Sequence, residues 1–102
     1  MSGAHSRNKG AGYERELVNA LRKFGLKAQR VPLSGATEYA KGDVEVTPGF
    51  DPALIYRGEC KRRASLPVLL KNIEGNDFLA LREDRGETLI VLRLPLFMEL
   101  LQ

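Results

Sequence analysis

The sequence predicts one α/β domain, with helices and strands arranged around a central mixed sheet. Apolar residues recur at helical spacing near the N-terminus and again after the middle of the chain, and short stretches elsewhere alternate apolar and polar residues as strands do. The predicted order is α-β-β-β-α-β-β with a short C-terminal helix, and 102 residues suffice for one modest core. Residues 1–10 have almost no apolar side chains and are expected to form a mobile basic lead-in to a single domain over residues 11–102.

The first helix is predicted from about residue 12 onward. Leu17 and Leu21 are four residues apart and so share one helix face, and Gly25 stands where the helix should end. Glu14 lies three residues before Leu17 and seven before Leu21, which places its carboxylate on the same apolar stripe. A carboxylate on a buried stripe is destabilising unless it is paired or bound to a metal. Glu14 is therefore expected to have a partner.

Acidic and basic residues are placed systematically on the predicted strands. In an extended strand Glu59 and Lys61 project from one face and Cys60 from the other, and Asp43 and Glu45 likewise share a face. The stretches after the first helix are, in order, a strand over residues 26–33, a Gly- and Ser-bearing loop over 34–42, a strand over 43–46, a turn-rich connection and a strand over 54–61.

The second half of the chain begins with a helix over residues 65–74, which Ser65 can cap and in which Pro67 is tolerated in the first turn. The segments "FLALR" and "TLIVLRL" then predict a hairpin, and "LFMELL" a closing helix. The apolar "LPLFMELL" is interpreted as core, with a dimer surface as the alternative.

Composition narrows the class of protein. The net charge is +3, but residues 1–30 hold seven Lys or Arg against Glu14 and Glu16, whereas residues 72–102 hold six acids against three arginines. A basic N-terminal half favours a polyanion such as nucleic acid. Cys60 is the only cysteine, so no internal disulfide can form, and no membrane-spanning or secretory segment is visible. We therefore expect a cytoplasmic protein, of a bacterium, an archaeon or a phage-infected host.

The charged residues on neighbouring strands suggest a chemistry. Asp43 and Glu59 can hold their carboxylates about one strand spacing apart, within reach of one hard cation that prefers oxygen ligands. Phosphodiester hydrolysis uses such a cation to activate water and to neutralise developing charge, and Lys61 can assist beside it. An E-x-K triplet alone is usually a solvated surface pair, so the order of Glu14, Asp43, Glu59 and Lys61 along the chain carries the argument.

The same residues resemble a known family. "GD" at Gly42 and Asp43, followed by "ECK" at residues 59–61, looks like the PD-(D/E)XK nuclease signature, with Gly42 in place of the variable proline. The segment "KGAGYERELVNALRKFGLKAQRVPLSG" resembles the opening of the archaeal-type Holliday junction resolvases and their phage relatives. The resemblance covers roughly residues 9–63, and it implies a restriction-endonuclease-like core that serves DNA recombination and repair.

The resemblance also implies roles for particular residues. Asp43, Glu59 and the backbone carbonyl of Cys60 would bind Mg²⁺, for which Mn²⁺ should substitute. Lys61 would act beside the attacking water, and Glu14 would complete the site or hold a second ion, while the Cys60 side chain would belong to the core. A homodimer that cuts four-way junctions by paired nicks is implied as well. The implied DNA contacts are Lys9, Arg15, Arg30, Ser34, Arg62 and Arg63.

Two other functions remain open from the sequence. One is a nuclease of the same fold that acts on flapped, nicked or duplex DNA. The other is a catalytically silent nucleic-acid-binding module. The presence of the full set Glu14, Asp43, Glu59 and Lys61 argues against this second function. Glu45 shares the face of Asp43 and is an alternative metal ligand, although a salt bridge further into the sheet is the favoured interpretation.

Overall fold

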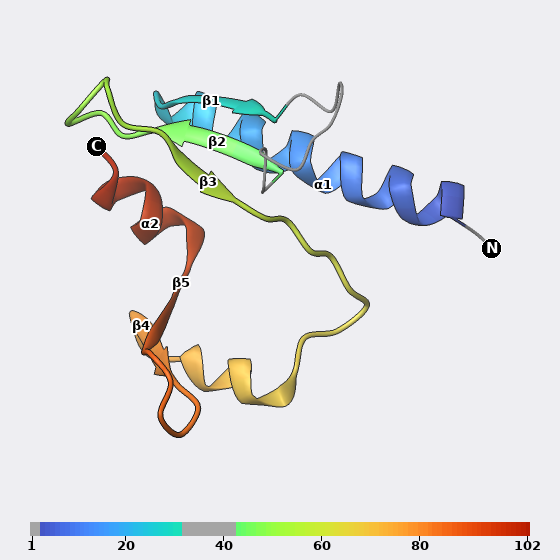
Figure 1. The fold of residues 1–102 in the computed structure, drawn as a ribbon, viewed down its shortest axis with the longest axis vertical. Helices are drawn as coiled ribbons and strands as arrows, with labels where there is room; N and C mark the ends of the chain where they lie inside the picture. Colours follow the sequence, from blue (N-terminus) through green and yellow to red (C-terminus); the bar gives the residue numbers. More distant parts are fainter. Residues whose placement is uncertain (1–2, 32–42) are drawn as a thin grey trace. The chain divides into compact units, whose positions relative to one another are not determined.

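The computed structural model describes residues 3–31 and 43–102, which form two compact units. One unit contains residues 1–62 and 101–102, and the other contains residues 63–100. The elements, drawn in Figure 1, are α1 (Gly3–Phe24), β1 (Lys27–Arg30), β2 (Val44–Thr47), β3 (Tyr56–Gly58), the 3-10 helix η1 (Val68–Ile73), β4 (Phe78–Leu81), β5 (Leu89–Leu92) and α2 (Leu94–Leu100).

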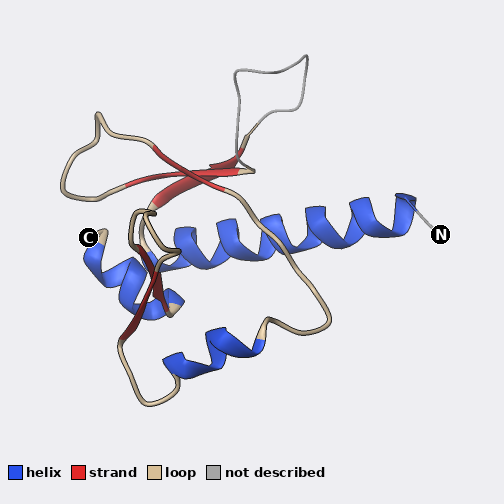
Figure 2. Ribbon diagram, turned by 60° about the horizontal axis from the view of Figure 1, so that its bottom comes forward, coloured by secondary structure: helices blue, strands red, loops and turns tan. Residues whose placement is uncertain are grey.

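The first unit is a three-stranded antiparallel sheet with α1 lying along one face (Figure 2). The strand order is β1-β2-β3, with Ala28 opposite Val46 and Val44 opposite Gly58. Alternation along β2 buries Val44 and Val46, and Ala28 on β1 is buried too. Leu21 of α1 is buried as the sequence predicts. The core of this unit therefore lies between α1 and the sheet.

α1 ends where the sequence predicts but begins earlier than residue 12. At its C-terminus Gly25 has φ 111°, its amide donates to the Arg22 carbonyl at 3.0 Å, and the Leu26 amide donates to the Leu21 carbonyl at 3.0 Å. These two bonds make a Schellman motif, which needs a left-handed residue that glycine supplies without strain. Because the motif turns the chain back, β1 can pair against β2 beside the helix.

The second unit contains the predicted hairpin and closing helix. β4 and β5 pair antiparallel, with Phe78 opposite Leu92 and Leu81 opposite Leu89. Between residues 63 and 100 every described residue is at least partly exposed, including Leu89 at 59% and Ile90 at 54%. Apolar side chains that are this exposed indicate a surface that another partner could cover.

Three predicted features differ from the structure. The described strands form not one central mixed sheet but two antiparallel ones, β1-β2-β3 and β4-β5. The β2–β3 and β4–β5 pairs are antiparallel because their connections are too short for the crossover that a parallel pair requires. The helix predicted over residues 65–74 is a 3-10 helix from Val68 to Ile73. The strand predicted over residues 54–61 is confined to β3, because its partner strand β2 begins at Val44, opposite Gly58.

The α/β character of the chain is confirmed, and the division into a lead-in and a single domain stays a prediction. None of the helices in the described part of the chain is both long and apolar enough to cross a membrane.

Candidate active site

Asp43 is held firmly at the start of β2. Its amide donates to the Gly58 carbonyl at 2.7 Å, and its own carbonyl accepts from the Val31 amide at 2.9 Å. Its half-buried carboxylate accepts a hydrogen bond from the Cys60 amide through Oδ2, at 2.7 Å. The backbone of β2 and the residues after β3 therefore fix the direction of this carboxylate.

Glu59 and Lys61 lie just beyond β3, not on it. Their side chains nevertheless come together as the sequence predicts, with Glu59 Oε2 3.3 Å from Lys61 Nζ. The side chains are 60% and 77% exposed, and an ion pair this exposed contributes less than about 1 kcal/mol. Breaking this ion pair therefore costs little free energy, so either side chain can bind a stronger partner instead.

Glu14, on the apolar stripe of α1, is paired with Arg30, as the sequence predicts that it needs a partner. Its Oε1 accepts from Arg30 Nε at 3.0 Å, and the carboxyl side chain is 18% exposed. Val18, one turn further along α1, is buried, so this face of the helix packs against the sheet. The partner of Glu14 in this structure is thus a guanidinium from β1.

The Cys60 thiol is affected by the charges of these carboxylates. Its pKa is raised above the ordinary value of 9.0, first by burial and then by the negative charges of Asp43, Glu14 and Glu59. The charges of three acids, from α1, from the residue before β2 and from the residue after β3, therefore all disfavour the Cys60 thiolate. The resemblance predicts a core position for this cysteine, but the structure leaves it half-buried.

The donor chemistry suits a hard divalent cation, since three carboxylates and the backbone around Cys60 offer only oxygen ligands apart from the thiol. Within residues 3–31 and 43–102, however, no three His, Cys, Asp or Glu side chains stand together as a metal-binding group. Glu14 is turned to Arg30 and Glu59 to Lys61. The residues fit such a site by their chemistry, and the exposed Glu59 is the side chain with most freedom to turn toward Asp43.

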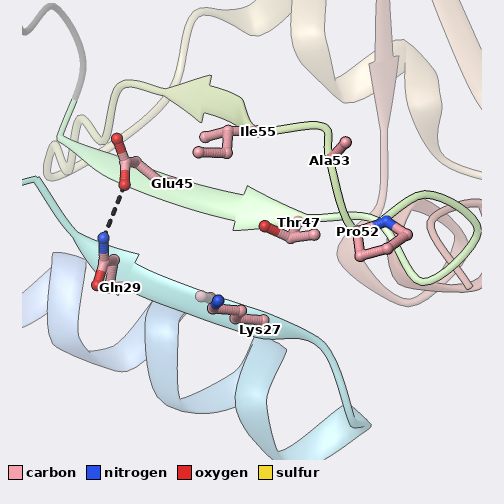
Figure 3. A pocket seen from close by; sticks show the side chains of 8 residues that line it. Lys27, Gln29, Glu45, Thr47, Pro52, Ala53 and Ile55 are labelled. Carbon is pink, nitrogen blue, oxygen red and sulfur yellow. Dashed lines mark hydrogen bonds between the residues drawn. The ribbon is translucent and has the colours of Figure 1, made fainter.

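Glu45 belongs to a different network. Its carboxylate accepts from Gln29 Nε2 at 2.8 Å and from Arg57 Nε at 3.2 Å. Figure 3 shows Glu45 and Gln29 beside a small pocket of about 150 Å³ that Lys27 and Ile55 also line. The predicted salt bridge of Glu45 is therefore confirmed, and its carboxylate is occupied by neighbouring strands.

The predicted DNA contacts fall in several places. Arg15 and Arg62 are exposed in the first unit, and Arg63 is exposed in the second. Ser34 and the side chain of Lys9 lie outside the described residues.

The structure has a pocket between α1 and β1 that was not predicted from the sequence. It is lined by Arg15, Val18, Asn19, Arg22 and Arg30. The signal was present in the sequence, because residues 15, 19 and 22 recur at helical spacing on one face of α1.

A family model described as archaeal Holliday junction resolvase (Hjc) matches residues 5–101. No curated protein and no solved structure gives a significant match.

Proposed function

The chain belongs to the archaeal Holliday junction resolvase family, and from this premise we propose that it is a magnesium-dependent endonuclease that cuts four-way DNA junctions by paired nicks. The observation that carries the proposal is the hydrogen bond from the Cys60 amide to the Asp43 carboxylate, which brings Asp43 beside the Glu59–Lys61 segment, in a family whose members are nucleases acting on DNA junctions.

The proposed metal ligands are Asp43, Glu59 and the backbone carbonyl of Cys60. When bound, Mg²⁺ would lower the pKa of a ligated water and neutralise charge on the phosphate that is cut. The Cys60 amide aims the Asp43 carboxylate by hydrogen bonding, so the firmest ligand is oriented before any ion binds. Glu59 would exchange Lys61 for the ion, because the exposed ion pair holds it only weakly.

Lys61 and Glu14 have supporting roles in this proposal. Once separated from Glu59, the Lys61 ammonium would lie beside the attacking water and stabilise negative charge that develops on the phosphate. Glu14 would complete the metal site or hold a second ion. Its bond to Arg30 also keeps that guanidinium at the edge of the site, where it can contact the DNA backbone.

The proposal is tested by offering the protein three labelled DNA substrates of equal length, a four-way junction, a flap and a linear duplex, with Mg²⁺, with Mn²⁺ or with EDTA. We expect cleavage of the junction alone, with either metal, and none in EDTA. Equal cutting of duplex or flap would replace the resolvase with a general nuclease of this fold. Tight binding without cutting in any metal would indicate a silent DNA-binding module.

A further inference from the structure

The pocket between α1 and β1 has the shape and charge of an anion site. It is open, has a volume of about 350 Å³, and is lined by Arg15, Val18, Asn19 and Arg22 from the helix and Arg30 from the strand. The four helix residues lie at positions i, i+3, i+4 and i+7, so they form one continuous stripe. Buried Val18 provides an apolar floor, and the polar residues surround it.

Two of the three guanidinium groups are held in place by the protein. Arg22 Nε donates to the Ala28 carbonyl at 2.7 Å, and Arg30 Nε donates to Glu14 at 3.0 Å. Among the described residues, neither guanidinium makes a further hydrogen bond or ion pair. Each arginine therefore uses its inner nitrogen for orientation and keeps its terminal nitrogens for a ligand, so less entropy is lost on binding.

The charge balance of the pocket favours a phosphate group. Three guanidinium groups and no carboxylate line the pocket, and Glu14, which is not part of the lining, pairs with Arg30 alone. The fork of an arginine matches two phosphate oxygens, and the neutral amide of Asn19 can add a donor without repelling an anion. Contacts of this kind to a DNA backbone carry no sequence information but fix where the duplex lies on the protein.

We propose that Arg15, Asn19, Arg22 and Arg30 form a binding subsite for a backbone phosphate of the junction DNA, with Arg22 and Asn19 as its new members. The inference rests on the proposed function, because it takes the substrate to be DNA. Arg30 lines the subsite and also binds Glu14, so a phosphate held here is positioned relative to that carboxylate. Arg22 and Asn19 are thus positioning residues for the strand that is cut.

The subsite is tested by measuring junction binding in EDTA, where no cleavage can occur, by fluorescence anisotropy over a range of salt concentrations. Arg22→Gln removes one charge from the pocket, and Asn19→Asp adds an opposing charge there while leaving the Arg22 bond to Ala28 intact. Lys23→Gln is the matched control, because it changes the net charge equally from an exposed position on the same helix outside the pocket.

We expect Arg22→Gln to weaken binding about tenfold, because one charged hydrogen bond is lost, and Asn19→Asp to weaken it about as much through its opposing charge. Arg22→Gln should also flatten the slope of log K against log salt by about 0.9. Lys23→Gln should change affinity by less than about twofold, since it removes only diffuse attraction. Thermal unfolding checks that the variants fold, and Asn19→Asp decides the result if Arg22→Gln does not.

Equal weakening by all three variants would overturn the subsite, because it would mean that only overall charge matters. Wild-type affinity in both pocket variants would overturn it as well and leave the proposed function intact. A wild-type protein that fails to bind the junction at all would overturn both.

Discussion

Asp43 and Glu59 differ in how firmly the protein holds them, and this difference shapes what their amide variants should do. In Asp43→Asn the side-chain oxygen can still accept from the Cys60 amide, and in Glu59→Gln only an exposed ion pair is lost. Both variants should therefore stay folded, with losses of about 1 kcal/mol or less. Because neutral amides bind a hard cation poorly, both should lose junction cleavage while binding the junction in EDTA at least as tightly as the wild type.

The matched control for these two variants is Glu45→Gln, which neutralises an acid held by Gln29 and Arg57. It should cleave at close to the wild-type rate, as a time course of junction cutting would reveal. Normal cleavage by Asp43→Asn or Glu59→Gln would exclude these carboxylates from the chemistry.

Variants of Glu14 can separate a structural role from a catalytic one, because the carboxylate accepts a hydrogen bond from Arg30 whether or not it takes part in catalysis. Glu14→Gln keeps an acceptor for Arg30 Nε, so it should cost about 1 kcal/mol or less in urea unfolding but slow cleavage markedly. Glu14→Leu leaves Arg30 Nε without this acceptor and should be inactive. A Glu14→Leu protein that is more stable than the wild type and fully active would remove Glu14 from the site.

Single residues were predictable where geometry follows from chain spacing. Positions two apart put Glu59 and Lys61 together, and helical spacing turned Glu14 inward. The partner of Glu14 was not predictable, because Arg30 reaches it only through the antiparallel placement of β1 beside α1. The same tertiary contact creates the pocket that includes Arg22.

At the scale of elements, replacing a glycine with alanine should have opposite effects on stability at two positions, Gly12 within α1 and Gly25 just after its end. Gly25 has φ 111°, which alanine adopts only with strain, whereas exposed Gly12 lies within the helix, and an added Cβ would meet nothing within 4 Å at either position. Gly25→Ala should therefore destabilise the fold by about 1 kcal/mol, and Gly12→Ala should stabilise it by about 0.5–1 kcal/mol. Urea unfolding measures both, and a stabilising Gly25→Ala would contradict the Schellman ending.

Element type was better predicted than element extent. The helix end at Gly25 and the β4–β5 hairpin follow from local turn chemistry, which sequence carries directly. The length of β3 depends on where β2 begins, and the absence of a mixed sheet among the described strands depends on which strands pair. Such pairings are set by distant parts of the chain, and no local pattern contains them.

On the scale of the whole molecule, the basic residues and most of the exposed apolar residues lie in different parts of the sequence. The basic excess lies within residues 1–30, whereas most of the exposed large apolar side chains, Ile90 among them, lie in the second unit, and a smaller number lie in the first. A four-way junction has two equivalent strands to cut, and one chain offers one set of carboxylates. Paired cutting therefore requires two copies related by a twofold axis.

We accordingly predict a homodimer at micromolar concentration that makes paired, symmetric nicks with 5′-phosphate ends. Ile90→Glu, which places a charge in the apolar segment "LIVLRLPLFMELL", should shift light scattering to a monomer and reduce coordinated nicks to single ones. Val68→Glu is the matched control, since it adds the same charge at a 77% exposed position in η1 outside that segment, and it should remain dimeric. Circular dichroism verifies that both variants fold. A wild-type protein that is monomeric while it cuts both strands in concert would contradict the dimer, because a single set of carboxylates would then have to serve both strands.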